Sequence, residues 1–274
     1  MSSQPSPLRV FHVDRAVVEI YSSKADAGKS AALRAATILE GAISRQGHSR
    51  LIMATGNSQE DLISSLVRAR NVDWSRVEVF HMDEYIGLPE SHRGSLRHWM
   101  KSRFVELVHP GRVNYLDGNA RDLDAECHRY EELLRERPVN LCMLGIGENG
   151  HIAFNEPHAA DFEDPLGVKR VQLDELSRNQ QAGEGHFSSP ASVPPEALTL
   201  TLPILMSSEE LICCVPEGRK REAVRNALQG PISPECPGSA VRKHANAHVY
   251  IDTDSAALLS LPAIDRGLYR ANGS

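Results

Sequence analysis

His151 is the residue of this chain whose type and setting best suit proton transfer. It lies in the stretch Leu141–Pro157, LCMLGIGENGHIAFNEP, where an apolar run leads into a loop that also holds Asn149 and Glu156. A neutral imidazole takes or gives a proton near neutral pH, and a carboxylate or amide beside it fixes its tautomer. Glu156 and Asn149 are the candidates for that partner. A lone loop histidine is more often structural, so a catalytic role requires other groups to converge on it.

Asp83 and Glu84 follow a second apolar segment, Val77–Phe80. Adjacent residues near a strand end point to opposite sides, so one carboxylate would face a cleft while the other holds the scaffold. Burial disfavours the charged form of a carboxylate and makes it a better proton acceptor than it is in water. We therefore predict a general base here. The competing interpretation is that Asp83 caps a turn.

The turn Thr55-Gly56-Asn57-Ser58 precedes a predicted helix and suits an anion. Free backbone N–H groups and the positive end of the helix dipole attract phosphate at such a turn. In the plainer interpretation, Gly56 forms the turn and Ser58 caps the helix. No Gly-Lys-Ser/Thr follows the turn, and the run GIGENG at 145–150 leads into nothing typical of a helix, so nucleotide binding is not predicted.

The elements that must position these residues alternate along the chain between strand and helix patterns. The strand-like segments are Ala16–Tyr21, Arg50–Ala54, Val77–Phe80, Val113–Leu116, Asn140–Leu144, Leu198–Leu202, Glu210–Val215 and Ala247–Ile251. The helical segments are Ala25–Ser44, Glu60–Ala69, Ser95–Val108, Leu123–Arg137 and Lys220–Gln229. This alternation predicts an α/β fold with a doubly wound, mostly parallel sheet and helices on both faces. Ligands of such sheets bind beyond the carboxyl ends of the strands, where the three groups of residues should meet.

Two regions depart from the alternation. Residues Met1–Val13 resemble a loose arm. Residues 158–192 are rich in Gly, Ser, Gln and charge, with only Lys169–Leu173 resembling a strand. A long, weakly patterned insertion directly after a candidate active loop is often a lid. We expect one domain over residues 1–274 with a lid-like insertion at 158–192.

Composition narrows the class of protein. The net charge of −6 over 274 residues disfavours a nucleic-acid surface. No apolar run reaches membrane-spanning length, and the beginning MSSQPSPLRV lacks the apolar core of a signal peptide, so a cytoplasmic location is expected. Five cysteines without a CxxC pair suit a reducing compartment. The oligomeric state is left open, and a homo-oligomer is compatible with the sequence. His81, Asp83, His151 and Glu156 match no familiar metal-ligand spacing, so no metal is expected.

Several segments of the chain resemble one known family. The strings TGNS, FHMDEYIGL, LGIGENGHIAFNEP and VPEGRKREAV are similar to signature segments of the glucosamine-6-phosphate deaminase (isomerase) family, over about Ala25–Leu259. The related 6-phosphogluconolactonases share the glycines and the histidine, but the run Phe154-Asn155-Glu156-Pro157 favours the deaminase branch. The resemblance implies conversion of glucosamine 6-phosphate to fructose 6-phosphate and ammonia, without metal or organic cofactor.

The resemblance also implies roles for the matching residues. His151 would shuttle the proton that opens the pyranose ring, with Glu156 and Asn149 orienting it. Asp83 would carry a proton from C2 to C1, and the resulting ketimine is hydrolysed. Substrate contacts are expected from the phosphate turn, from the lysine that pairs with the phosphate, and from neighbours in the motifs: Thr55, Gly56, Asn57, Ser58, Glu84, Gly145, Ala153 and Lys220.

Three positions depart from the family pattern. Asn149 stands where many members have Asp. Gly185 falls at the place of the usual phosphate-binding arginine, so either Arg178 or Arg170 of the insertion works with Lys220, or the substrate differs. The segment Pro157–Leu173 lacks the basic pattern of the N-acetylglucosamine 6-phosphate effector site, so no such activation is expected. Two alternatives remain: a sugar-phosphate lactone hydrolase in which His151 activates water, and a sugar-phosphate sensor without turnover.

Overall fold

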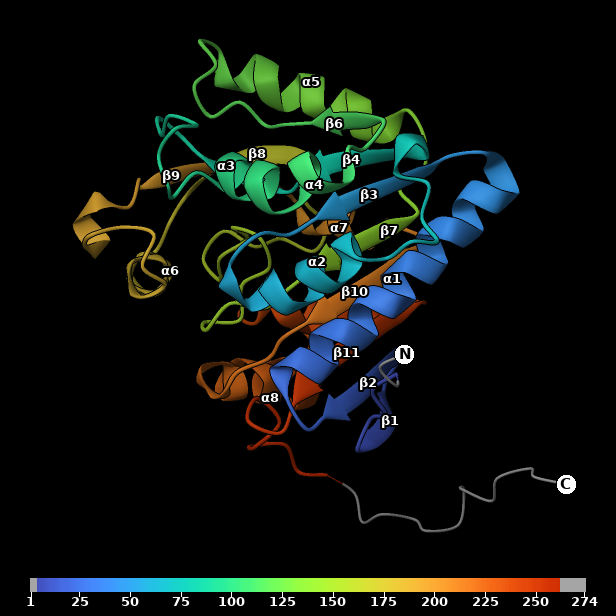
Figure 1. Ribbon diagram of the computed structural model, residues 1–274. Helices are drawn as coiled ribbons and strands as arrows, with labels where there is room; N and C mark the ends of the chain where they lie inside the picture. Colours follow the sequence, from blue (N-terminus) through green and yellow to red (C-terminus); the bar gives the residue numbers. More distant parts are fainter. Residues whose placement is uncertain (1–3, 262–274) are drawn as a thin grey trace, which may run out of the picture.

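A computed structural model of the chain describes residues 4–261, so Met1–Ser3 of the expected arm lie outside the described residues. An eight-stranded sheet runs through the molecule (Figure 1), and every neighbouring pair of its strands is parallel except the antiparallel pair β1–β2. The order across the sheet is β1 (Arg9–Val13), β2 (Ala16–Tyr21), β11 (Ala247–Asp252), β10 (Glu210–Cys214), β7 (Leu141–Leu144), β3 (Ser49–Met53), β4 (Val77–His81) and β6 (Arg112–Asn114). The predicted mostly parallel sheet is confirmed.

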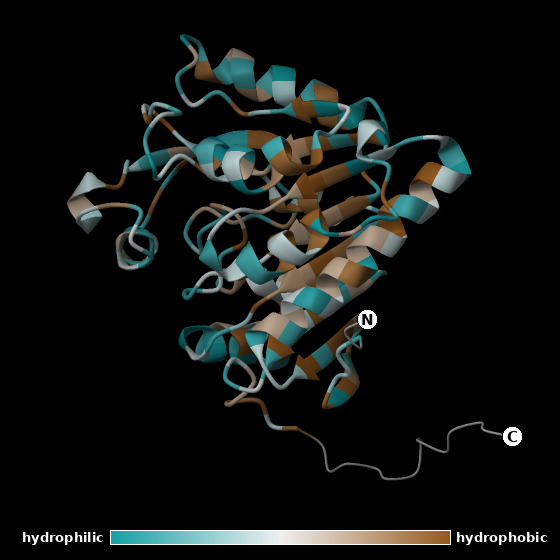
Figure 2. Ribbon diagram, viewed as in Figure 1, coloured by the Kyte–Doolittle hydropathy of each residue, from teal (hydrophilic) through white to brown (hydrophobic). Residues whose placement is uncertain are grey.

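Helices cover both faces of this sheet because its inner strands are apolar on both sides. In β7, Cys142 and Leu144 pack into one hydrophobic cluster while Leu141 and Met143 pack into another. The first cluster is covered by α5 (Leu123–Arg135), α7 (Leu202–Met206) and α8 (Arg221–Gln229). The second is covered by α1 (Lys24–Gln46), α2 (Glu60–Val67) and the helical run of α3 (Leu96–Met100), a π-helical turn (Lys101–Val105) and α4 (Glu106–Val108). Figure 2 shows the hydrophobic residues gathered in the strands and on the inner sides of these helices.

The expected loose arm contains a strand. Arg9–Val13 pair with β2 in antiparallel register, from Arg9 opposite Ile20 to Val13 opposite Ala16. The segment is short and half-exposed, so its local sequence gives a weak signal. It is fixed instead by the backbone groups that the edge of β2 offers, which is a tertiary effect.

A second, antiparallel sheet of three strands lies beside the first. Its order is β5 (Asp83–Tyr85), β9 (Glu196–Leu200) and β8 (Val168–Gln172). The chain passes from β4 of the large sheet to β5 of the small sheet through the single residue Met82. Asp83 therefore lies on a strand of the small sheet, paired with Thr199, where the sequence placed it at the end of the preceding strand. This pairing fixes the backbone of the candidate base.

The insertion at 158–192 contains more regular structure than its pattern predicted. Besides β8 it holds α6 (Glu175–Gly183), in which Ser177 is buried. A helix with so little buried surface has no apolar stripe for sequence analysis to find. The remaining short elements are 3-10 turns at Asn57–Gln59, Trp74–Arg76, Pro190–Ser192, Gly218–Lys220 and Pro237–Lys243. Within residues 4–261, none of the helices combines the length and apolar character that a membrane crossing requires.

Candidate active site

A cavity opens where the strands β3, β4, β7 and β10 end, at the edge of the sheet predicted to hold the site. Most of the predicted site residues line it, namely Thr55, Gly56, Ser58, Asp83, Gly145, His151, Ala153 and Lys220. The insertion also reaches the cavity through Gln180, Gln181, Glu184 and His186. The predicted residues that do not line the cavity, Asn57, Glu84, Asn149 and Glu156, support those that do.

His151 is held from behind by a carboxylate and a hydroxyl. Its Nδ1 atom lies 3.3 Å from Oε2 of Glu156 and 3.2 Å from Oγ of Ser177. Gly147 makes room for the ring, since a Cβ there would stand 2.2 Å from Cε1 of His151. With Nδ1 occupied in this way, Nε2 is the ring atom left to exchange a proton with a ligand.

Glu156 is fully buried and charged. Burial opposes its ionisation, but the charge of His151 and hydrogen bonds from His151, Ser177 and Asn149 outweigh burial and lower the pKa of Glu156 to about 2. A carboxylate that stays ionised beside Nδ1 fixes the tautomer of the imidazole and stabilises its protonated form. This is the orienting role expected of Glu156.

Asn149 acts on His151 indirectly. Its Nδ2 donates to Oε2 of Glu156 at 2.6 Å and to Oδ2 of Asp174 at 2.9 Å, and its Oδ1 accepts from the backbone N–H of His151 at 3.1 Å. An amide is suited to this position because it lies between two carboxylates and donates to both. An aspartate here would add a third negative charge, so Asp174 offers a physical reason for the departure at Asn149.

Asp83 has the properties of a general base that works near neutral pH. Its side chain is buried, and burial, followed by the nearby charge of Glu84, raises the pKa of Asp83 to about 7, while the charge of His151 opposes the rise. The carboxylate lines the same cavity as His151. The competing interpretation, a turn cap, does not describe a residue paired within a sheet.

Glu84 points away from the cavity, as the alternation along a strand requires. Its carboxylate accepts hydrogen bonds from Ser95 Oγ at 2.9 Å and from the backbone N–H groups of Leu96 and Arg97 at 3.2 and 2.8 Å. It thus caps the first turn of α3 and fixes β5 against that helix. The expected substrate contact of Glu84 does not fit this position, because its oxygens are occupied by the scaffold.

The turn at 55–58 presents small residues to the cavity. Gly56 has φ +102°, a backbone conformation that disfavours side chains, and Thr55, Gly56 and Ser58 line the cavity. Ser58 does not act as the helix cap of the plainer interpretation, since α2 begins after Gln59 without a side-chain cap. Asn57 turns away, donating to the backbone oxygen of Glu184 at 3.1 Å. The turn is therefore tied to the insertion.

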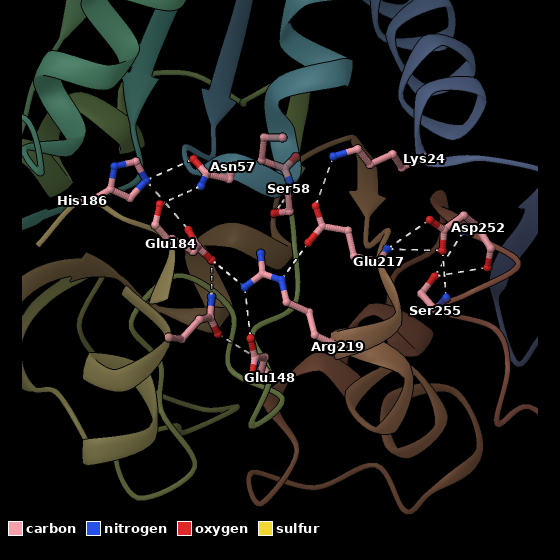
Figure 3. A network of polar contacts seen from close by, with 12 residues as sticks. Lys24, Asn57, Ser58, Glu148, Glu184, His186, Glu217, Arg219, Asp252 and Ser255 are labelled. Carbon is pink, nitrogen blue, oxygen red and sulfur yellow. Dashed lines mark hydrogen bonds and ion pairs between the residues drawn. The ribbon is translucent and has the colours of Figure 1, made fainter. Parts of the chain in front are cut away.

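Lys220 supplies a buried ammonium to the same cavity. It lines the cavity with 2% of its surface exposed, and burial, followed by the charge of Arg219, lowers the pKa of Lys220 to about 8. Arg219 is itself bound to carboxylates: Nη1 donates to Glu148 at 3.0 Å and to Glu184 at 2.9 Å, and Nε donates to Glu217 at 2.7 Å (Figure 3). Lys220 remains the cation offered to a ligand from this segment.

Neither arginine proposed to replace the missing one reaches the cavity. Arg170 pairs with Glu196 through two hydrogen bonds, and Arg178 donates to the backbone oxygen of Pro190. The first of the two expectations was therefore wrong for these arginines, because both side chains bind other groups and neither lines the cavity. The cavity is lined instead by Arg93 and His186, which the sequence analysis did not select. Gly185 has φ +84°, a conformation that glycine adopts more readily than residues with side chains.

Residues 22–250 match the family described as glucosamine-6-phosphate isomerases/6-phosphogluconolactonase, and the chain belongs to this family. Similar curated proteins include the glucosamine-6-phosphate deaminase of Bacillus cytotoxicus, 34% identical over 89% of this chain and 88% of that protein. The glucosamine-6-phosphate deaminase of Bacillus cereus strain B4264 is 35% identical over 81% of this chain and 83% of its own length.

Comparison with solved structures agrees with this family. A monomeric glucosamine-6-phosphate deaminase superposes with a TM-score of 0.81 at 33% identity, covering 88% of this chain and 99% of that one. The 6-phosphogluconolactonase of Trypanosoma brucei has a TM-score of 0.73 at 15% identity, over 89% of this chain and 98% of its own. At that identity the likeness to the lactonase is one of fold alone.

Proposed function

We propose that the chain converts glucosamine 6-phosphate to fructose 6-phosphate and ammonia. The observation that carries the proposal is the convergence of Asp83 and His151 on one cavity that also presents the 55–58 turn and Lys220. An aldose–ketose isomerisation needs one base placed between adjacent carbons and a second acid/base at the ring oxygen. The curated relatives at 34% and 35% identity are named as deaminases of this substrate.

The proposed reaction begins at His151. With Nδ1 held by Glu156, Nε2 takes the proton of the anomeric hydroxyl and returns it to the ring oxygen, which opens the pyranose. The Glu156 carboxylate stabilises the imidazolium that forms between these two steps. No other group needs to change charge in ring opening.

Asp83 then acts on the open chain. Its carboxylate removes the proton from C2, the electrons form the C1–C2 double bond of an enolamine, and the aldehyde oxygen takes a proton from the substrate's own ammonium group on C2. Asp83 returns its proton to C1, which leaves a protonated ketimine at C2. Water adds to that carbon and ammonia leaves, giving the ketose. Because burial raises the pKa of Asp83 to about 7, the carboxylate is a stronger base than a solvent-exposed aspartate and is still substantially ionised near neutral pH.

The 55–58 turn and Lys220 would hold the phosphate, since backbone N–H groups and an ammonium are the donors that such a group requires.

We further propose that residues 158–192 act as a lid within a single domain, because α6 and the segment after it line the cavity. A cytoplasmic location is proposed from the five free cysteines. One similar solved structure is that of a monomeric glucosamine-6-phosphate deaminase, and size-exclusion chromatography would report whether this chain self-associates.

A coupled measurement of ammonia and fructose 6-phosphate from glucosamine 6-phosphate tests the proposal. Absence of ammonia would remove it. Release of 6-phosphogluconate from its lactone, retained in an Asp83→Asn variant, would favour the hydrolase alternative. Thermal stabilisation by the sugar phosphate with no product formed would favour the sensor alternative.

A further inference from the structure

The carboxylate of Glu184 lies at the end of the cavity formed by the 55–58 turn, where the phosphate of the ligand should bind. Its Oε2 atom is 3.9 Å from the position that a Cβ on Gly56 would occupy, and both residues line the cavity. The backbone oxygen of Glu184 accepts a hydrogen bond from Asn57, so the residue is fixed against the 55–58 turn (Figure 3). Only 7% of the Glu184 side chain is exposed.

The two carboxylate oxygens of Glu184 have different surroundings. Oε1 accepts hydrogen bonds from Nη1 of Arg219 at 2.9 Å and from Nε2 of Gln180 at 3.0 Å. Oε2 faces the turn and lies 4.0 Å from Nε2 of His186. The bonds to Oε1 hold the carboxylate in place, and Oε2 is the oxygen that meets a ligand on the turn.

The positive charges near this end of the cavity do not offset the negative charge of Glu184 enough to favour a doubly charged ligand. Arg219 is shared among Glu148, Glu184 and Glu217, so its charge is already offset. Lys220 and Arg93 also line the cavity, and their two positive charges less the one negative charge of Glu184 leave one positive charge, which a singly charged ligand would balance. A fully ionised phosphate has acceptor oxygens only, and one of them would face Oε2, which is an acceptor too. A phosphate that keeps one proton would donate that O–H to Oε2.

We propose that Glu184 is a specificity-determining residue, which accepts a hydrogen bond from the ligand's phosphate and selects the singly charged, protonated form of a sugar phosphate over the doubly charged form. This inference rests on the proposed function, because it takes a sugar phosphate as the ligand. The proposal also accounts for Gly185, which stands at the place of the family's usual phosphate-binding arginine. Without that arginine the cavity binds the dianion less tightly, and Glu184 instead recognises the proton of the monoanion.

Two ligands of matched shape test the proposal: fructose 6-phosphate, whose phosphate loses its second proton with a pKa of about 6, and fructose 6-sulfate, which is a single anion without a proton at every working pH. Binding of each is measured by calorimetry in ammonium-free buffer. The charged and titratable groups that act on Glu184 or its neighbour His186 are Glu60, Tyr85, Arg93, Arg103, Arg219 and Lys220, and Glu148 and Glu217 share Arg219 with Glu184. These groups and His186 are present with either ligand, so the ratio of the two dissociation constants isolates the phosphate proton.

In the wild-type protein, the phosphate-to-sulfate ratio of dissociation constants should rise about twentyfold between about pH 5.5 and pH 7.5, as the phosphate monoanion disappears. In Glu184→Gln the rise should shrink to about threefold or less, and phosphate binding at the higher pH should tighten about tenfold, because an amide also donates to the dianion. Glu175→Gln, at an exposed position in α6, the helix that ends just before Glu184, should keep the wild-type rise.

A ratio that is flat or falls with pH in the wild-type protein would overturn the inference, because the dianion would then bind at least as well. The wild-type measurement decides this even if Glu184→Gln fails to fold. Failure to bind either ligand also overturns it. Ammonia release from glucosamine 6-phosphate, measured on the same preparation, separates the two proposals: a preparation that releases ammonia but lacks the pH dependence leaves the function standing and removes the role of Glu184.

Discussion

The Nδ1 atom of His151 lies 3.3 Å from Oε2 of Glu156, and the carboxylate of that pair is fully buried. Replacing Glu156 by Gln removes the charge that fixes the tautomer and stabilises the imidazolium. We expect the rate constant kcat to fall about a hundredfold or more, with a smaller change in KM, since Glu156 does not line the cavity. Steady-state ammonia release measures both. Unchanged kcat in a folded Glu156→Gln protein would contradict the role.

The pH dependence of the rate should follow Asp83. A base whose pKa is raised to about 7 is ionised above that pH, so kcat/KM should decline by up to tenfold per pH unit below it. A pH–rate profile over glucosamine 6-phosphate measures this. A profile that stays level down to about pH 5 would show that the base is a carboxylate with an ordinary pKa.

Asp83 should also destabilise the folded protein at alkaline pH. Its folded pKa of about 7 lies above its ordinary value, so the folded state holds a proton that the unfolded state has released, and stability falls as pH rises toward 7. Asp83→Asn removes the buried charge. We expect its Tm to exceed that of the wild type by about 3 °C or more at pH 8, and by little at pH 4. Equal Tm values at pH 8 would contradict the assigned burial penalty.

Ser177 is expected to position His151 from the inserted helix. Its Oγ lies 3.2 Å from Nδ1 and is buried. Ser177→Ala should lower kcat about tenfold and shift the pH–rate profile, while leaving KM near its wild-type value. Ser188→Ala, an exposed serine of the same insertion, is the matched control. A drop in Tm with an unchanged pH–rate profile would assign Ser177 a structural role only.

The protein should need an uncharged amide at position 149, because the side chain there lies between two carboxylates. Asn149→Asp would set a carboxylate where Nδ2 now donates to Glu156 and Asp174 at 2.6 and 2.9 Å. We expect a loss of about 2 kcal/mol in unfolding free energy at pH 7. The double variant Asn149→Asp with Asp174→Asn should recover most of the loss. Denaturant titration measures both, and additive losses in the double variant would sink this explanation.

The sequence predicted those parts of the site that lie within single strand–loop units. The loop after β7 supplies His151 and Glu156 five residues apart, and the turn after β3 supplies Thr55–Ser58, so periodicity and turn chemistry located both. The crevice then follows from parallel strands, whose carboxyl ends share one edge.

The contributions of the insertion could not be predicted in this way. Ser177 meets His151 across 26 residues, and Asn57 meets Glu184 across 127. Helix α6 buries too little apolar surface to leave a periodic pattern, and its position depends on these polar contacts. Arg93 and His186 were missed as well, because the sequence around a loop residue does not indicate which cavity that residue lines. Asp83 was placed correctly at the cavity, but its strand pairing with β9 joins segments far apart in the sequence.

The central claim, that Asp83 and His151 divide the proton transfers on one hexose, is tested most directly by counting products from glucosamine 6-phosphate. The wild-type protein should release ammonia and fructose 6-phosphate in equal amounts. Asp83→Asn should bind fructose 6-phosphate yet release ammonia at least about a hundredfold more slowly. No ammonia from the wild type, or an undiminished rate in Asp83→Asn, would contradict the account.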